Sequence, residues 1–291
     1  MTDIEVRSDA IEALPALREV IARYQLSAQK SLGQNFLLDL NITDKIVRQA
    51  QSFGGASNAS WSEIHAIEIG PGPGGLTRAL LKADCHSVTA IELDRRAIEA
   101  LDDLKEASLG DLQIIEENAL DLDITAISDS PRVIVANLPY NIATPLLINW
   151  LKQIRLDPES YHSMSLMFQK EVADRILANA GTKSYGRLSI IAQWLCDVRL
   201  LYNLPPSAFT PPPKVNSSVV HFIPKILEVD APLFDEVEKI TAKAFNQRRK
   251  MIRSSLKEYL SHIEELGINP QARPEELQVE DFLNLAKRAS R

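Results

Sequence analysis

The spacing of apolar residues changes along the chain and divides it into regions. Residues 11–24 place apolar side chains at three- and four-residue steps, which predicts an amphipathic helix. Residues 42–50 carry the same spacing and predict a second helix. The stretch 52–60 is rich in Gly, Ser and Asn and is expected to end that helix.

Short apolar runs alternate with helical patterns from residue 65 to residue 224. The runs predict strands over 65–69, 87–93, 112–118, 132–137, 164–168, 198–204 and 217–223. The intervening patterns predict helices from about Leu76, over 95–107, from Thr144, over 170–179 and over 186–195. Strands that alternate with helices are typical of an α/β fold with a doubly wound sheet.

Beyond Pro224 only helical periodicity remains. A length of 291 residues fits one large domain followed by one small domain. We therefore expect an α/β domain over residues 1–226, with an N-terminal helical extension. A small all-helical domain is expected over residues 227–291.

The composition is that of a soluble globular protein, with 45% hydrophobic and 24% charged residues. The acidic N-terminus lacks the apolar core of a signal peptide, and no run of about 18 apolar residues occurs. We therefore expect a cytoplasmic protein without membrane contact. Two cysteines, Cys85 and Cys196, cannot form a disulfide framework, and the five histidines are scattered, so no metal site is expected.

The charge of the chain is unevenly distributed. A net charge of −7 argues against a nucleic-acid partner when it is taken alone. Residues 243–257, however, hold six basic residues and no acidic one, whereas residues 228–238 are rich in acids. Local patches decide contacts, so the basic segment favours binding to phosphates. A solvated helix face is the other interpretation.

The first motif with chemical meaning is AIEIGPGPGGLT, residues 66–77, where a predicted strand runs through four glycines into a predicted helix. Glycines allow a sharp turn and a close approach of a ligand to the main chain. Glu92 ends the next strand, 22 residues after Gly70, where a carboxylate binds ribose hydroxyls in such folds. The motif is neither a clean dinucleotide fingerprint nor a P-loop. A purely structural turn is the alternative.

The second motif is Asn137-Leu138-Pro139-Tyr140, directly after the apolar run 132–137. Ligands bind at the carboxyl ends of strands in open α/β sheets. The amide oxygen of Asn137 and a neighbouring main-chain carbonyl can accept both hydrogens of an exocyclic amine, and Tyr140 can stack on the base that carries it. The alternative is a strand-end turn with a packed tyrosine.

The chain resembles the ribosomal RNA adenine dimethyltransferases over roughly residues 25–260, and their small-subunit branch most closely. The shared motifs occur in one order: GQNFL, EIGPGPGGLT, IELD, NLPYNIATPLL, FQKEVADRI, YGRLSIIAQ, PPSAFTPPPKVNSSVV and AFNQRRKMIRSSL. The resemblance implies a Rossmann-like class I methyltransferase sheet with helices on both faces. It implies transfer of methyl groups from S-adenosyl-L-methionine to the N6 amines of two adjacent adenosines near the 3′ end of 16S rRNA. The expected partner is that RNA within an immature small ribosomal subunit, and the expected state is a monomer.

The resemblance also implies a role for individual residues. The cofactor-binding residues are Asn35, Leu37, Gly70, Gly72, Glu92, Asn118 and Asn137. The catalytic residues are Asn137, Leu138, Pro139, Tyr140 and Phe209, with Phe209 stacking on the second face of the target adenine. The RNA-binding residues are Arg248, Arg249, Lys250 and Arg253.

Asn118 departs from the family pattern, which usually has aspartate before the alanine at position 119. An asparagine can accept a hydrogen bond from an adenine amine through its oxygen. It can also present its own NH₂ group to the base, which would be the wrong polarity. The sequence leaves the orientation of this amide open.

Three alternatives stay open at this point. A dimethyltransferase of large-subunit rRNA shares the asparagine-proline-tyrosine core, although the NQRRK and FTPPPKVNSSVV segments resemble the small-subunit branch more. A DNA adenine methyltransferase usually has Pro where Leu138 stands. A non-catalytic assembly factor would bind precursors of the ribosome without turnover.

Overall fold

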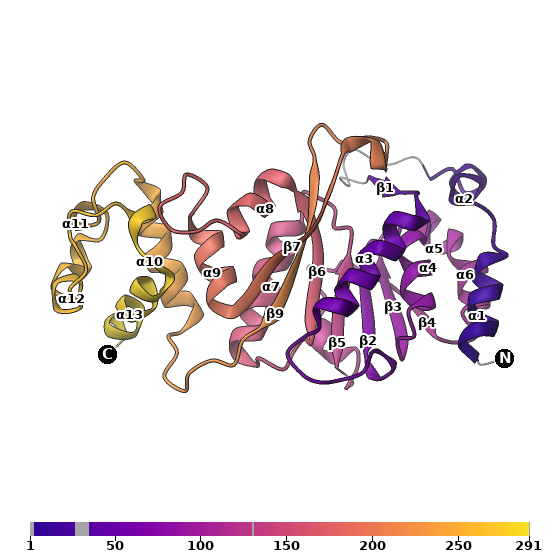
Figure 1. Ribbon diagram of the computed structural model, residues 1–291, viewed down its shortest axis with the longest axis horizontal. Coiled ribbons are helices and arrows are strands. Elements are labelled where there is room, and N and C mark those ends of the chain that lie inside the picture. The colour runs from indigo at the N-terminus through magenta and orange to yellow at the C-terminus, as the bar shows by residue number, and fades with distance from the viewer. Residues whose placement is uncertain (1–2, 27–34, 130, 291) are drawn as a thin grey trace. The chain divides into compact units, whose positions relative to one another are not determined.

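The computed structural model describes residues 3–26, 35–129 and 131–290 (Figure 1). The strands are β1 (Phe36–Leu37), β2 (His65–Ile69), β3 (Ser87–Glu92), β4 (Leu112–Glu116), β5 (Arg132–Ala136), β6 (Ser163–Gln169), β7 (Cys196–Leu204), β8 (Phe209–Thr210) and β9 (Ser217–Pro224). The helices are α1 (Asp3–Glu12), α2 (Leu17–Arg23), α3 (Leu40–Phe53), α4 (Gly75–Lys82), α5 (Arg95–Ala100), α6 (Asp102–Ala107), α7 (Ala143–Leu156), α8 (Lys170–Ile176), α9 (Arg187–Leu195), α10 (Phe234–Asn246), α11 (Ile252–Ser255), α12 (Leu260–Glu265) and α13 (Val279–Ala289).

Seven strands form the central sheet, in the order β4-β3-β2-β5-β6-β9-β7. Strands β2 to β6 run parallel to one another, and β9 is antiparallel to β6. From β2 the chain first adds β3 and β4 on one side and later β5 and β6 on the other. The carboxyl ends of β2 and β5 therefore flank a switch point, where ligands bind in open α/β sheets.

The doubly wound α/β sheet predicted from the sequence is confirmed, and each of its seven predicted strands is present. The predicted single helix over residues 11–24 is wrong, because α1 ends at Glu12 and α2 begins at Leu17. Pro15 lies between them, lacks an N–H donor and disfavours helical backbone in the residue before it. Its carbonyl instead accepts a hydrogen bond from Arg78 on α4, at 3.0 Å.

A second difference is the small sheet of β1 and β8, in which Phe36 pairs with Thr210 and Leu37 with Phe209. Each strand has only two residues, too few to show an alternating pattern in the sequence. The pair joins a segment before the first long helix to a segment near the end of the central sheet. It lies outside that sheet and contributes one wall of the site described below.

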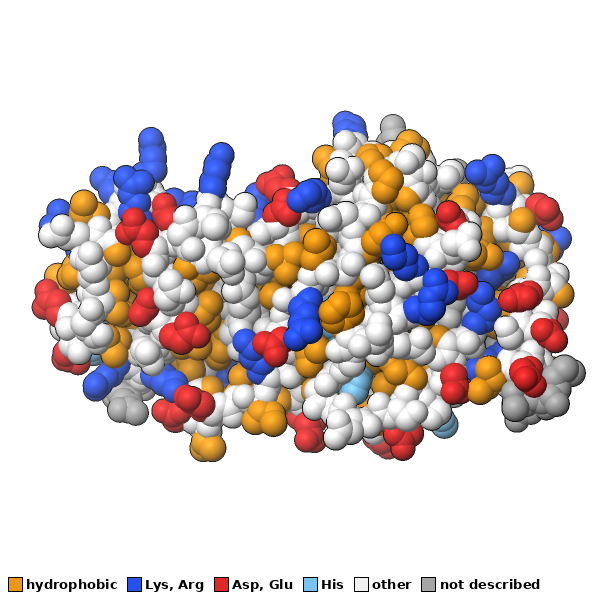
Figure 2. All heavy atoms as spheres, in the orientation of Figure 1, with side chains coloured by type: hydrophobic (Ala, Val, Ile, Leu, Met, Phe, Trp, Pro, Cys, Tyr) orange, Lys and Arg blue, Asp and Glu red, His pale blue; other side chains and the backbone are white. Residues whose placement is uncertain are grey.

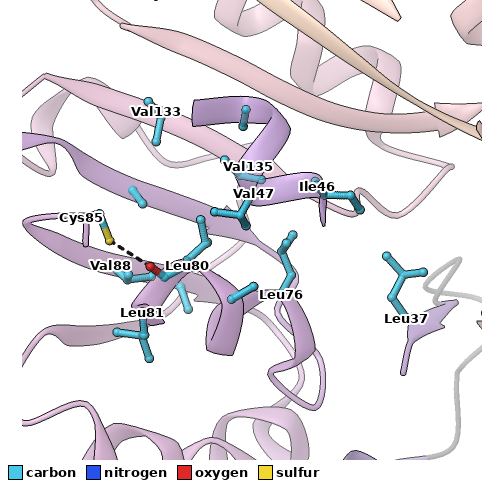
Figure 3. Packing of buried hydrophobic residues seen from close by; sticks show 14 of the residues in the cluster. Leu37, Ile46, Val47, Leu76, Leu80, Leu81, Cys85, Val88, Val133 and Val135 are labelled. Carbon is cyan, nitrogen blue, oxygen red and sulfur yellow. Dashed lines mark hydrogen bonds between the residues drawn. The ribbon is translucent and has the colours of Figure 1, made fainter. Parts of the chain in front are cut away.

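The core against the central sheet is built of buried apolar side chains (Figure 3). Ile46 and Val47 of α3, Leu76 and Leu80 of α4 and Val88 of β3 are at most 4% exposed. Burial of each such side chain stabilises the fold by about 1.5–3 kcal/mol. α3 and α4 contact each other and lie in front of the strands in Figure 1. This packing fixes the helix that follows the glycine motif.

The chain divides into two compact units. The first comprises residues 1–149, 159–170 and 199–223, and the second comprises 150–158, 171–198 and 224–291. The core of the second unit includes Phe245, whose ring centroid lies 6.2 Å from that of Tyr185 and 5.9 Å from that of Phe282. The units therefore group residues 150–158 and 171–198 with the C-terminal helices. The sequence-based division after residue 226 stays a prediction.

Within the described residues, every helix is too short or too polar to cross a membrane.

Candidate active site

A cavity lies at the switch point of the sheet, in the first unit. Its lining residues follow the ends of β2, β3, β4 and β5 or precede α3. They are Asn35, Phe36, Ile69, Gly70, Gly72, Ile91, Glu92, Leu93, Glu117, Asn118, Ala119, Leu120, Asn137, Leu138, Pro139, Tyr140, Asn141 and Ile142. The empty space, with the open mouth included, is about 960 Å³.

The glycine motif forms the floor beside β2. Gly70 and Gly72 have φ angles of +67° and +54°, in the left-handed region that favours glycine. A Cβ atom built on Gly72 would lie 2.7 Å from Cε1 of Phe36. Glycine is therefore required at position 72 for its backbone and for its lack of a side chain. The turn keeps the main chain of this loop at the cavity surface.

Glu92 ends β3 and is 6% exposed. Its Oε1 accepts hydrogen bonds from the N–H groups of Leu93 and Asp94, at 2.8 and 2.9 Å. Its Oε2 has one longer contact with the N–H of Gly72, at 3.4 Å. Burial raises the pKa of Glu92, and the three backbone donors oppose that rise. One carboxylate oxygen is thus held by the backbone, and the other retains capacity for a ligand in the cavity.

A second buried carboxylate, Glu68 of β2, lies below the glycine motif. Its Oε2 accepts a hydrogen bond from the Thr77 hydroxyl on α4, at 2.6 Å. Burial raises the pKa of Glu68 to about 8, the Thr77 hydrogen bond lowers it, and the charge of Glu92 adds to the rise. Glu68 does not line the cavity, and the sequence analysis did not single it out. It ties β2 to the helix after the turn.

Asn137 follows β5, and its side-chain orientation is fixed from across the site. Its Nδ2 donates to the main-chain carbonyl of Asn35, at 2.8 Å. A carbonyl only accepts hydrogen bonds, so this contact selects the NH₂ side of the Asn137 amide. Oδ1 is thereby left as an acceptor at the cavity wall. Asn35 takes part through its backbone, a contribution that the residue type does not reveal.

Tyr140 is anchored by a residue that is remote from it in the chain. Its hydroxyl forms a 2.6 Å hydrogen bond with the hydroxyl of Ser217, a buried residue at the start of β9. Burial raises the pKa of Tyr140. The neutral phenol therefore persists at physiological pH, and the ring is anchored at the edge of the cavity.

Asn118 lies after β4 and is half-buried in the wall beside Ala119. Its Nδ2 donates to Oδ2 of Asp121, at 2.6 Å. Its Oδ1 accepts from the N–H of Leu120, at 3.2 Å. The structure thus gives this amide a defined orientation, which the sequence left open.

Leu37 and Phe209 lie outside the cavity wall, although the sequence analysis assigned them to the site. They face each other in the β1–β8 pair, are 5% and 3% exposed, and pack in the apolar core. Successive side chains of a strand point to opposite sides, so the neighbour Phe36 lines the cavity in place of Leu37. A cofactor contact of Leu37 and a stacking role of Phe209 stay predictions.

Several lining residues were missed by the sequence analysis. They are Phe36, Ile69, Ile91, Leu93, Glu117, Ala119, Leu120, Asn141 and Ile142. Most lie at or just after the ends of predicted strands, and that position was an available signal. Leu93 is 57% exposed and presents an apolar side chain at the cavity.

The basic segment belongs to the second unit and comprises the end of α10, the turn 247–251, α11 with Arg253, and Lys257. Figure 2 shows Lys and Arg side chains in blue at the surface near α10 and α11. Arg248 donates through Nη2 to the carbonyls of Lys183 and Tyr185, at 2.9 and 2.7 Å. Arg249, Lys250 and Arg253 are exposed and form no ion pair within the described part of the chain. Arg248 therefore supports the turn, while the other three present charge to solvent.

The assembled side chains favour chemistry by positioning. The cavity presents fixed acceptors at Glu92, Asn118 and Asn137, an aromatic ring at Tyr140 and a glycine-rich floor. It offers no histidine, cysteine or lysine among its lining residues to act as a strong base or nucleophile. Such a site suits transfer of a group that is already activated.

Comparisons with known proteins agree with this geometry. A family model described as "Ribosomal RNA adenine dimethylase" matches residues 25–291. The protein "Ribosomal RNA small subunit methyltransferase A" of Ruegeria sp. (strain TM1040) is 49% identical, with 96% of this chain and 98% of the relative covered. The protein of the same name from Rhodospirillum rubrum is 50% identical, with 95% and 93% covered.

Two solved structures are also similar. A dimethyladenosine transferase from Plasmodium falciparum has a TM-score of 0.70 and 29% identity, and the match covers 85% of this chain and 94% of that one. The 23S rRNA methyltransferase ErmE has a TM-score of 0.63 at 21% identity, covering 88% and 100%, and shows the shared fold.

Proposed function

The chain belongs to the ribosomal RNA adenine dimethylase family, and from this membership we propose how its cavity performs the reaction. It is an S-adenosylmethionine-dependent rRNA adenine dimethyltransferase with a Rossmann-like class I sheet. It transfers methyl groups to the N6 amines of two adjacent adenosines near the 3′ end of small-subunit rRNA, giving N6,N6-dimethyladenosine.

The residues of the cavity fit the methyl donor. Oε2 of Glu92, which has only the long contact with Gly72, would accept hydrogen bonds from the ribose hydroxyls, and Oδ1 of Asn118 would accept one from the adenine amine. The exposed side chain of Leu93 offers an apolar surface for the adenine ring. The glycine floor at Gly70 and Gly72 leaves room for the amino-acid part. When bound, the donor supplies a methyl group already activated by its sulfonium.

The target amine would be held at Asn137. Its Oδ1 and the carbonyl of Leu138 would accept the two N6 hydrogens, which favours a pyramidal nitrogen with an available lone pair. The observation that carries this proposal is the hydrogen bond from Asn137 Nδ2 to the carbonyl of Asn35, because it fixes the orientation of the amide and leaves Oδ1 as an acceptor for the substrate. Pro139 stiffens the turn. Most of the rate enhancement would come from alignment.

The target adenine has to leave its stack to reach this position. The ring of Tyr140 would hold one face of the base, at about 1–3 kcal/mol by alanine-substitution scales. Phe209 would hold the second face only if the β1–β8 pair moved, because its side chain is buried there. An enzyme that dimethylates also needs space at the amine for the first methyl group.

RNA would be bound through the basic turn of the second unit. Arg249, Lys250 and Arg253 would contact phosphates, and Arg248 would position the turn. The substrate form we propose is the 16S rRNA of an immature small subunit, bound by a monomer of this chain.

One experiment tests the function as a whole. The protein is incubated with isotopically labelled S-adenosylmethionine and either undermethylated small subunits or large-subunit RNA. Mass spectrometry then maps the methylated adenosines. We expect N6,N6-dimethyladenosine at two adjacent positions near the 3′ end of the small-subunit RNA. Label confined to large-subunit RNA would overturn the assignment, and stable binding without label transfer would favour a non-catalytic factor.

The RNA-binding turn gives a separate prediction. Replacing Arg249, Lys250 and Arg253 by Gln removes three phosphate contacts, so the slope of log affinity against log salt should fall by about one unit per contact. Filter binding across a salt series measures this slope. Replacing the exposed Arg18 and Lys105 by Gln removes two positive charges from the first unit, and this control should leave the slope nearly unchanged. If the triple variant has the same slope as the wild type, these residues do not contact RNA phosphates and form a solvated surface.

A further inference from the structure

We propose that Asp121 is a positioning residue for cofactor specificity: it fixes the Asn118 amide so that the oxygen, and not the NH₂ group, faces the cofactor base. The inference rests on the proposed cofactor site. It explains how an asparagine performs a task that the family usually gives to an aspartate. Asp121 would act through Asn118 and not by touching the ligand.

Two independent contacts set the orientation of the amide. The Asp121 carboxylate is 2.6 Å from Nδ2 of Asn118, and a carboxylate accepts hydrogen bonds. The N–H of Leu120 is 3.2 Å from Oδ1 of Asn118, and a backbone N–H only donates. Rotating the amide by half a turn would place donor against donor and acceptor against acceptor. The chemistry of both neighbours therefore selects one orientation.

The contact with Asp121 is the stronger of the two. It is charge-assisted and short, whereas the contact with Leu120 is a longer bond between neutral groups. Without the carboxylate, the Nδ2 group would lose its acceptor and only the Leu120 contact would oppose rotation. The preference for one orientation therefore depends mainly on Asp121.

Of the two residues, only Asn118 contributes to the cavity wall. Asn118 lines the cavity, whereas Asp121 is exposed and does not line it. Oδ1 of Asn118 has a second lone pair besides the one used by Leu120, and that lone pair can accept from an exocyclic amine. A base with a carbonyl at the same position would face this oxygen with another acceptor. The pair Asn118–Asp121 thus selects an amino base over an oxo base.

The test compares two ligands that differ at this position. Calorimetry measures the Kd of S-adenosylhomocysteine, which carries the 6-amine, and of S-inosylhomocysteine, which carries a 6-oxo group. In Asp121→Ala the amide is free to rotate, so the preference for the amino ligand should fall about three- to tenfold, the range for one hydrogen bond. S-adenosylhomocysteine should bind more weakly, and S-inosylhomocysteine should bind more tightly.

A double substitution separates orientation from structure. An aspartate at position 118 has two oxygens and no NH₂ group, so it presents an acceptor in either orientation. In the Asn118→Asp background, removal of Asp121 should therefore leave the preference for S-adenosylhomocysteine over S-inosylhomocysteine unchanged. We expect the Asn118→Asp, Asp121→Ala protein to regain the preference lost in Asp121→Ala. Asp123→Ala removes one negative charge from the same loop, where the Asp123 carboxylate accepts from the N–H and the hydroxyl of Thr125. This control should keep the wild-type ratio of the two Kd values.

The possible outcomes are distinct. If Asp121→Ala melts at the wild-type temperature and keeps the wild-type ratio, the proposal is overturned. It is also overturned if the same loss occurs in the Asn118→Asp background, because Asp121 would then act through charge or local structure. If the wild-type protein does not bind S-adenosylhomocysteine, the proposed function itself fails. If the wild-type protein binds S-adenosylhomocysteine and S-inosylhomocysteine equally well, the inference about Asp121 is overturned and the proposed function is not.

Discussion

The cavity has two sides that are built in different ways. We call Gly70, Gly72, Glu92 and Asn118 the cofactor side, and Asn137 and Tyr140 the target side. On the cofactor side, Glu92 and Asn118 are held mainly by donors and acceptors within three residues along the chain. On the target side, Asn137 is held by Asn35, 102 residues earlier, and Tyr140 by Ser217, 77 residues later.

The difference separates two tasks. The side chains of the cofactor side are oriented by local turns, so this side can form once β2, β3 and β4 have paired. The target side is set by contacts between remote segments, so it forms only when the whole first unit is in place. Preorganised acceptors accelerate a reaction, and distant anchors provide that rigidity. Substitutions on the two sides should therefore alter different measured quantities.

The largest expected effect is on the target side. Asn137→Ala removes the acceptor that strengthens as the amine becomes pyramidal, and the single-turnover methylation rate should fall about 10²- to 10³-fold. The measurement uses saturating cofactor, with the cofactor Kd determined separately. A rate equal to that of the wild type would remove Asn137 from the chemical step.

The second effect, on the cofactor side, should appear in the cofactor Kd and much less in the methylation rate. Glu92→Gln keeps an oxygen for the N–H groups of Leu93 and Asp94 but loses the charged acceptor for ribose, so the cofactor Kd should rise about 10- to 100-fold. Alanine is a poorer choice, because it would leave both N–H groups without this acceptor. At saturating cofactor the methylation rate should change much less than in Asn137→Ala. A large loss of methylation rate in Glu92→Gln with an unchanged cofactor Kd would show that the two sides do not have separate tasks.

A smaller effect should follow from loosening the anchor of the target side. Tyr140→Phe keeps the ring but leaves the buried Ser217 hydroxyl without its partner, so activity should fall a few-fold. Tyr140→Ala should lose far more, because stacking is lost as well. Tyr140→Phe with Ser217→Ala removes both hydroxyls and should recover part of the loss. Equal damage in Tyr140→Phe and Tyr140→Ala would show that the hydroxyl matters more than the ring.

The smallest effect concerns stability and pH on the cofactor side. The pKa of Glu68 is raised from its ordinary value of 4.5 to about 8, so the folded chain holds a proton that the unfolded chain has lost. The contribution of Glu68 to folding stability should therefore be fully present below pH 4.5 and be lost as the pH rises towards 8. Glu68→Gln has no proton to lose and still accepts from Thr77. Its melting temperature relative to the wild type should rise by a few degrees between pH 5 and pH 8. A difference that does not vary with pH would contradict the raised pKa.

The same contrast explains what the sequence could predict. The alternating strands and helices and the strand-end positions of Gly70, Glu92 and Asn137 follow from local periodicity and motif spacing. The contacts that aim Asn137 and Tyr140 involve a backbone carbonyl and a serine remote in the chain, and no local pattern encodes them. Phe36 was missed in favour of Leu37, because two residues are too few to show which side faces the ligand.

The β1–β8 pair also has a consequence for synthesis of the protein. Phe36 reaches its place at the cavity through a strand whose partner is Thr210, and the anchor of Tyr140 is Ser217. A nascent chain emerges from its N-terminus at about 5–20 residues per second. From the emergence of Asn118 to that of Ser217, about a third of the chain, it holds the cofactor motifs without the segment that anchors Tyr140. The target side can therefore be assembled only after roughly three quarters of the chain has emerged, although the cofactor motifs are present well before that point.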